Sequence, residues 1–295
     1  MELHTSGQYW DQRDLTELLA LDLDGQNRYR SHTSDVDNHG HVYGGQLIAQ
    51  TLWAAAQGAE GRSPSLLQMT FLNEASPLDT IEYSVELLQD GRSFSNRHIY
   101  GVQGTGLVLS ANASFQKTST DSGRVYHLDR LLPTPESLPT LAELAASQMH
   151  QGHTLRLRLI DRPVLDVRPI RAERAGGRPE DQPEVGYWVR LNQPLPNEGC
   201  LHPAALAYMS DCWLNRCLVP SPSMPDPWQH GRVSQLNHSL WFHSSLIDAN
   251  DWLLFLSEPV RSLAGRGLVT THIYQRYGRL VASMTQDMLL SPLVE

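Results

Sequence analysis

The chain has 295 residues, of which 40% are hydrophobic, so it can bury one large core or two cores of ordinary size. Its 23 Lys and Arg residues against 32 Asp and Glu residues give a formal net charge of -9, without the basic excess that nucleic-acid binding requires. The three cysteines have no C-x-x-C spacing, which argues against a disulfide framework and a zinc site. Neither a signal peptide nor an apolar run of membrane-spanning length is recognisable, so we expect a cytoplasmic protein with no membrane span and no nucleic-acid partner.

The first half of the chain predicts one short helix, one long helix and then strands. The short helix is expected over residues 12–20, and an Ala-rich apolar helix follows Gly44 and Gly45 and ends near Gly58. Turn signals divide the β-rich region that comes next. The three β-rich runs cover 66–74, 79–88 and 93–116.

The second half repeats this order after a polar segment. Residues 118–155 begin with polar residues and then carry a short helical stretch after Pro139, which predicts a linker. A helix follows whose first turn holds Pro203, a position where a missing N–H does no harm. The strands expected in this half lie at 164–170, at 185–192 and between about 233 and 290.

Two short motifs recur at the same spacing. Gly-Arg at 91–92 and His-Ile-Tyr at 98–100 return 174 residues later, at 265–266 and 272–274. This repetition predicts that one unit of a helix and a sheet has been duplicated. We therefore expect an α+β chain with a domain over 1–117, a linker with a short helix over 118–155 and a second domain over 156–295.

Two polar residues interrupt apolar faces of the second half. On the predicted helix, a face at helical spacing is apolar except for Asp211, and in the last strand the alternate residues from 280 to 290 are apolar except for Gln286. A buried carboxylate needs hydrogen bonds and has a raised pKa, so Asp211 is a candidate catalytic group. The alternatives are an aspartate that reaches solvent at the edge of the face, and a glutamine that bonds only to neighbouring backbone.

Several ordered motifs resemble the type II acyl-CoA thioesterases. They are Gly-Gly-Gln-Leu-Ile-Ala-Gln at 44–50, Asp-Gly-Arg-Ser-Phe at 90–94, Ala-Ser-Phe-Gln at 113–116, Tyr-Met-Ser-Asp-Cys-Trp at 208–213, Asn-His-Ser-Leu-Trp-Phe-His at 237–243, Arg-Gly-Leu-Val at 266–269 and Leu-Val-Ala-Ser-Met-Thr-Gln at 280–286. The resemblance spans both halves and is poor only in the linker and near 218–230. It implies a tandem, or double, hotdog fold, in which each half wraps an antiparallel sheet around a long helix.

The resemblance also implies a catalytic set of an aspartate, a hydroxyl residue and a glutamine. The aspartate falls on Asp211 and the glutamine on Gln286, but the position of the hydroxyl residue holds Gln235. Ser234 stands next to it and could take its place only through a bulge or a register shift, because successive strand side chains point to opposite faces. We therefore expect Gln235 to be the site residue, which with Gln286 orients a water that Asp211 activates.

The backbone N–H groups of Gly44 and Gly45 are candidate donors to the substrate oxyanion, because they stand at the start of a helix. The alternative is that these glycines only allow the helix to pack closely against its sheet. None of the closely spaced histidines carries the additional ligands of a metal site, so we expect neither a metal nor another cofactor.

We therefore expect an enzyme that hydrolyses acyl-CoA to a carboxylic acid and CoA. One rival is a noncatalytic protein that binds acyl-CoA or another acyl thioester, which the glutamine at 235 favours. A second rival is a hotdog hydratase of enoyl thioesters, although its Asp-x-Asn-x-x-His constellation is not evident. Duplication supplies the sheet pairing within one chain, so a monomer would suffice, and assembly into homo-oligomers is compatible with it.

Overall fold

A computed structural model of the protein describes residues 8–117, 125–141, 143–144, 162–170, 184–212 and 231–292. The strands of the first half that enter the main sheet are β2 (Leu21–Leu23), β3 (Arg28–Ser31), β5 (Arg62–Phe71), β6 (Glu82–Asp90), β7 (Phe94–Gln103) and β8 (Gly106–Lys117). Those of the second half are β9 (Leu165–Ile170), β10 (Val185–Leu191), β11 (Gly231–Phe242), β12 (Leu253–Leu263), β13 (Arg266–Gln275) and β14 (Leu280–Pro292).

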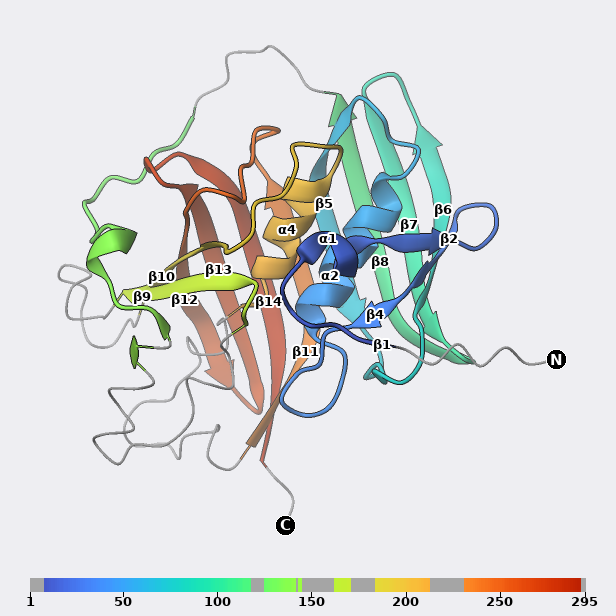
Figure 1. Ribbon diagram of the computed structural model, residues 1–295, viewed down its shortest axis with the longest axis horizontal. Helices are drawn as coiled ribbons and strands as arrows, with labels where there is room; N and C mark the ends of the chain where they lie inside the picture. Colours follow the sequence, from blue (N-terminus) through green and yellow to red (C-terminus); the bar gives the residue numbers. More distant parts are fainter. Residues whose placement is uncertain are drawn as a thin grey trace.

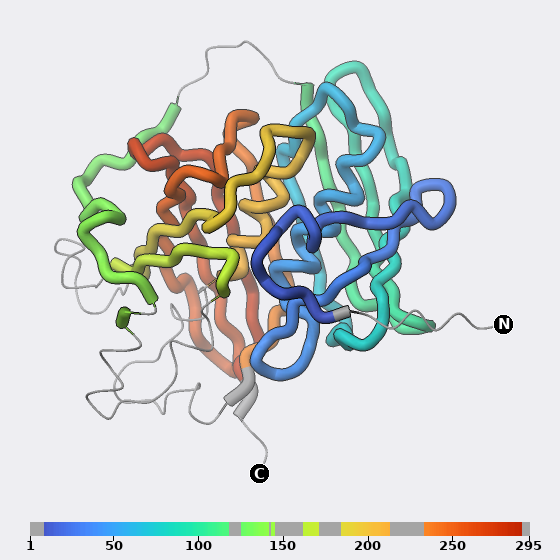
Figure 2. The backbone as a smooth tube through the Cα atoms, in the orientation of Figure 1, coloured from blue at the N-terminus to red at the C-terminus, as the bar shows by residue number. Residues whose placement is uncertain are grey.

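All of these strands form one antiparallel sheet, and the two halves of the sheet mirror each other. The order is β2-β3-β6-β7-β8-β5-β11-β14-β13-β12-β10-β9, so the halves meet where β5 pairs with β11. In Figure 2 the first half, blue to green, lies beside the second half, yellow to red. The repeated Gly-Arg motifs lie in the turns between β6 and β7 and between β12 and β13, in agreement with the expected duplication.

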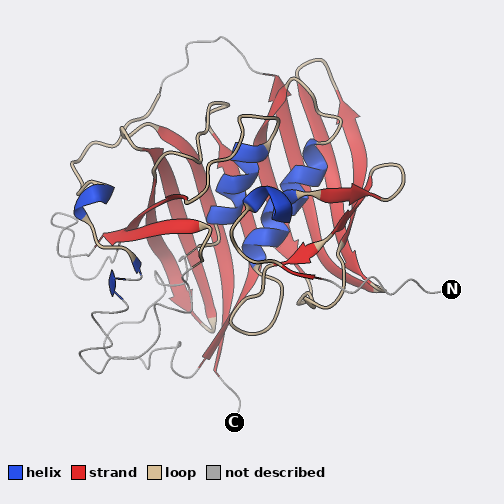
Figure 3. Ribbon diagram, in the orientation of Figure 1, coloured by secondary structure: helices blue, strands red, loops and turns tan. Residues whose placement is uncertain are grey.

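The helices lie on one face of this sheet (Figures 1 and 3). They are α1 (Leu15–Leu19), α2 (Gly44–Ala56) and α4 (Leu201–Met209), and a 3-10 turn, η1, covers Pro135–Ser137. Helices α2 and α4 pack against each other and are almost entirely buried, because the curved sheet covers them from behind. Each half is thus a sheet wrapped around a helix, which is the tandem hotdog architecture that was expected.

The strands near the amino terminus were not predicted. β1 (Gln8–Tyr9) pairs in parallel with β4 (Thr33–Ser34), and β2 and β3 extend the main sheet beyond β6. These strands have two to four residues each, which is too few for a recognisable alternation of polar and apolar side chains. Helix α1 is shorter than predicted because it begins after Asp14, whose side chain accepts a hydrogen bond from the N–H of Thr16 and caps the helix.

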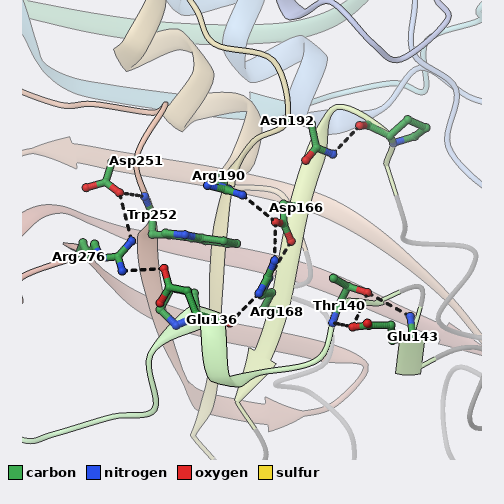
Figure 4. A network of polar contacts seen from close by, with 12 residues as sticks. Glu136, Thr140, Glu143, Asp166, Arg168, Arg190, Asn192, Asp251, Trp252 and Arg276 are labelled. Atoms are coloured by element: carbon green, nitrogen blue, oxygen red, sulfur yellow. Dashed lines mark hydrogen bonds and ion pairs between the residues drawn. The ribbon is translucent and has the colours of Figure 1, made fainter.

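The described part of the predicted linker is attached to the second half (Figure 4). Arg276, directly after β13, donates to Glu136 at 2.6 Å, and Arg168 of β9 donates to the carbonyl oxygen of Pro135 at 2.9 Å. Leu138 packs in a small apolar cluster formed by β9, β10 and β12 with Trp252. Most of the helix predicted after Pro139 lies outside the described residues. Among the helices that the structure describes, none has the length and apolar character needed to cross a membrane.

Candidate active site

Asp211 lies in the turn directly after α4. The predicted helical face continues past it, but α4 ends at Met209. The hydroxyl of Ser210 donates to the carbonyl oxygen of Ala207, and the N–H of Cys212 bonds to Met209 instead of to the residue before it. These contacts tighten the last turn and end the helix. Asp211 is nevertheless buried, with 8% of its surface exposed.

The surroundings of Asp211 place its titration near neutral pH. Burial raises the pKa of its carboxyl from 3.8 to about 7, because an ionised carboxylate is poorly solvated in the protein interior. A hydrogen bond from Gln286, the positive charge of Arg162 and the backbone N–H of Gly45 act in the opposite direction and favour the ionised form. A carboxyl with this pKa can both accept and return a proton near pH 7.

Two glutamine amides converge on this carboxyl. Gln286 of β14 donates its Nε2–H to Oδ1 of Asp211 at 3.1 Å, and Gln235 of β11 donates to the same oxygen. The Oε1 atoms of both glutamines are buried and have no hydrogen-bond partner in the described structure. The two side chains therefore present acceptor atoms next to the carboxyl, and a water molecule could donate to them.

A β-bulge decides which residue of β11 faces Asp211. Gln235 pairs with Met288 and Asn237 pairs with Asp287, so one extra residue, Leu236, is inserted between them. The bulge reverses the alternation, and Gln235 on one side of it faces the helices together with His238 on the other. The contact between Gln235 and Asp211 agrees with the choice of Gln235 over Ser234, although its role in catalysis stays a prediction.

The start of α2 closes the other side of the carboxyl. A Cβ atom on Gly44 would lie 2.5 Å from Oε1 of Gln235 and 2.8 Å from Oδ2 of Asp211. A Cβ atom on Gly45 would lie 2.6 Å from the carbonyl oxygen of Tyr208 in α4. Both glycines thus permit close packing of α2 against the second half of the chain. The N–H of Gly45 also donates a hydrogen bond to Asp211, so the carboxylate already occupies this candidate oxyanion donor.

A buried ion pair holds α2 and α4 together near the site, and sequence reasoning missed it. Arg162, the residue before Pro163, bonds to both oxygens of the fully buried Asp35, each at 2.5 Å. Tyr208 donates to Asp35 at 2.7 Å, and the backbone carbonyl of Asp35 accepts the N–H of Tyr43 just before α2. The guanidinium of Arg162 stacks 3.5 Å above the ring of Tyr43. In the sequence, Arg162 and Asp35 are single charged residues in polar segments, and nothing in those segments indicates that the two residues pair.

Sequence reasoning also assigned no role to His238 beyond that of a sheet residue. His238 is completely buried, and burial lowers its pKa to about 3, so the imidazole is neutral. The hydroxyl of Ser210 donates its hydrogen to the carbonyl of Ala207, so its oxygen accepts a hydrogen bond from Nε2–H of His238, at 3.0 Å. This contact connects β11 to the turn that carries Asp211.

Two mirrored positions in the first half carry no amide. β5 has the same type of bulge, between Pro64 and Leu66, so Pro64 corresponds to Gln235. In the second pair after each bulge, Ala113 of β8 corresponds to Gln286 of β14. The amide pair that contacts Asp211 therefore has no counterpart at these two positions.

Comparisons with known proteins agree with this fold. A family model described as the acyl-CoA thioesterase C-terminal domain matches residues 135–290, and one described as the acyl-CoA thioesterase N-terminal domain matches residues 32–116. The chain is 27% identical to acyl-coenzyme A thioesterase 8 of Rattus norvegicus, over 92% of this chain and 87% of that protein. It is 26% identical to acyl-CoA thioesterase 2 of Haemophilus influenzae, over 94% and 96% of the two chains.

A solved structure shows the same architecture. The crystal structure of the acyl-CoA thioesterase II TesB2 from Mycobacterium marinum superposes with a TM-score of 0.78, at 26% identity, over 95% of this chain and 98% of that chain. The fold and these relatives thus define a thioesterase of double-hotdog architecture. Within that class, the chain belongs to the type II acyl-CoA thioesterase family.

Proposed function

We propose that this protein hydrolyses acyl-CoA to a free carboxylic acid and CoA, with a water molecule that Asp211 activates. The observation that carries this proposal is a buried carboxyl with a pKa of about 7 that accepts hydrogen bonds from two glutamine amides. The relatives named acyl-CoA thioesterases support the choice of substrate.

In the proposed reaction, ionised Asp211 takes one proton from the water, and the water oxygen attacks the thioester carbonyl carbon. Oε1 of Gln286 or Gln235 accepts the other hydrogen of the water and orients its lone pair. When the tetrahedral intermediate collapses, the carbon–sulfur bond breaks and the proton held by Asp211 passes to the leaving thiolate. The products are the acid and the free thiol, and no covalent intermediate with the enzyme is needed.

The rival function is binding of acyl thioesters without turnover. Gln235 supports it, because an amide takes the place of the family hydroxyl and donates directly to the carboxyl that would act as base. The two functions differ in one measurable quantity, the release of free thiol.

The test is an assay of thiol release over acyl-CoA chains from acetyl to palmitoyl, with acyl-pantetheine for comparison. The parent protein is assayed beside Asp211→Asn and the matched control Asp287→Asn, which changes the same kind of group on the opposite face of β14. We expect turnover by the parent and the control and a loss of at least about a hundredfold in Asp211→Asn.

Equal rates in the parent and in Asp211→Asn would refute the role of Asp211. Absence of turnover with measurable acyl-CoA binding would instead establish the rival function. In that case Gln235→Thr, which restores the hydroxyl, should produce thiol release if this position alone has silenced the site.

A further inference from the structure

Tyr43 carries a buried hydroxyl for which the rest of the described protein provides no partner. The residue immediately precedes α2, its backbone N–H donates to Asp35, and its carbonyl accepts the N–H of Gln46. Its side chain is 7% exposed, and its Oη atom has no hydrogen-bond partner in the described structure. A buried hydroxyl without a partner costs free energy, so its retention requires an explanation.

The hydroxyl end of the ring lies beside the glycines that contact the catalytic carboxyl. The Cβ position of Gly45 is 2.3 Å from Cε1 and 2.8 Å from Cζ of Tyr43, and Cζ is the atom that bears the hydroxyl. The N–H of the same Gly45 hydrogen-bonds Asp211. The Cβ position of the neighbouring Gly44 is 2.8 Å from Oδ2 of Asp211. The phenol and the carboxyl therefore border the same two-residue segment of backbone.

The chemistry of the unpartnered atoms is complementary. Oε1 of Gln286 and Oε1 of Gln235 are acceptors, whereas the Tyr43 hydroxyl can donate a proton. Burial keeps this hydroxyl protonated because it raises the pKa of Tyr43, and the charge of Asp211 raises it further. The Arg162 guanidinium above the ring withdraws electron density and strengthens the O–H as a donor.

We propose that the hydroxyl of Tyr43 is a catalytic hydrogen-bond donor to the carbonyl oxygen of the bound thioester. This proposal rests on the proposed function and assigns a further group to it. As the water oxygen bonds to the carbonyl carbon, the π electrons move to the carbonyl oxygen, and the Tyr43 O–H stabilises the negative charge there. The proton stays on Tyr43. The electrons return to the carbon–oxygen bond when the carbon–sulfur bond breaks.

Tyr43→Phe tests the proposal, because it removes one oxygen atom that has no partner in the described protein. All backbone contacts of the residue remain, so the melting temperature should be unchanged or slightly higher than that of the parent. We expect kcat to fall about a hundredfold, the usual effect of losing one oxyanion donor. KM should change by less than about threefold, because the donor acts on charge that develops after binding.

Tyr83→Phe is the matched control. Tyr83 is also completely buried, but its hydroxyl donates to Gln50 at 2.8 Å. Its loss should lower the melting temperature by about 2 to 4 °C and leave kcat unchanged. The proposal is overturned if Tyr43→Phe keeps kcat within about threefold of the parent. It is also overturned if its kcat falls together with a decrease in melting temperature like that of Tyr83→Phe.

A binding experiment separates this proposal from the proposed function. The probes are acyl-CoA analogues in which a difluoromethylene ketone, –CO–CF2–, replaces the thioester link between the chain and CoA, and analogues in which a thioether replaces it, with hexyl, decyl and hexadecyl chains. Tyr43→Phe should weaken binding of the ketone about tenfold or more and leave binding of the thioether unchanged, because only the ketone forms an oxyanion. Equal effects on both probes would refute the donor role of Tyr43, whether or not the parent protein releases thiol.

Discussion

Replacing Asp211 by asparagine should stabilise the protein at alkaline pH while it removes turnover. The pKa of this carboxyl is about 7 in the folded protein, against an ordinary value of 3.8. Between these two values the folded protein holds a proton that the unfolded chain releases, so the stability of the parent falls as the pH rises through this window. Above the folded pKa, the folded protein contains a buried negative charge, and the loss is complete.

The magnitude follows from the width of the window. The interval from roughly pH 5 to the folded pKa of about 7 spans about two pH units. Each unit changes the free energy of unfolding by about 1.4 kcal/mol. The parent should therefore lose about 3 kcal/mol between roughly pH 5 and 8 through this group alone. Asparagine has no charge to bury, and its Oδ1 can still accept the hydrogen bonds of Gln286 and Gln235.

Urea denaturation at roughly pH 5 and pH 8 measures the free energy of unfolding of the parent, Asp211→Asn and Asp287→Asn. The free energy of unfolding should fall more steeply with pH in the parent and in Asp287→Asn than in Asp211→Asn, with a difference of about 3 kcal/mol. Parallel pH dependence in the parent and in Asp211→Asn would show that the pKa is not raised in the folded state. The reasoning from burial would then be refuted.

Three further substitutions examine the surroundings of the carboxyl. Gln286→Leu removes the amide that favours the ionised base, so the acid limb of the kcat/KM–pH profile should move up by about one unit, and an unchanged limb would count against this contact. Gly44→Ala should lower kcat at least about tenfold with little change in melting temperature, because the new Cβ displaces only the flexible ends of side chains. The control is Gly106→Ala, whose Cβ would lie 3.5 Å from its nearest neighbour, and its kcat should match that of the parent. Arg162→Met leaves the carboxylate of Asp35 buried without a charge partner and should cost about 3 to 5 kcal/mol in urea denaturation, and addition of Asp35→Asn should recover part of this loss. No recovery in the double variant would show that lost packing, and not the unpaired charge, destabilises the protein.

Asp211 and Gln286 were singled out because they are polar residues that interrupt apolar faces, and the structure brings them into direct contact. For β14 the alternation was correct, since residues 282, 284, 286 and 288 are all buried. For Asp211 the face was predicted on a helix that ends two residues earlier, yet the residue is buried all the same. Contacts with Gln235 and Gln286 of its own half and with the start of α2 in the first half, and not helical periodicity, account for its burial.

The rest of the site depends on contacts that no local pattern contains. Arg162 and Asp35 are 127 residues apart, and neither lies in a segment with apolar periodicity. The bulge that brings Gln235 and His238 to the same face is defined by the pairing of β11 with β14 and has no marker in the sequence of β11. Tyr43 belongs to the motif that begins the long helix, but only the packed structure shows that its hydroxyl has no partner.

The amide pair is present in the second half and absent at the mirrored positions of the first half. This asymmetry is possible because both units belong to one chain. In a dimer of identical hotdog units, each substitution is present in both copies. A change that improves packing at one copy of a position therefore also alters the chemistry at the other copy. Joining the two units in one chain removes this coupling. Ala113 and Pro64 then contribute to stability alone, while Gln286 and Gln235 remain free to specialise, and a costly buried carboxyl has to be accommodated at only one of the two sets of positions.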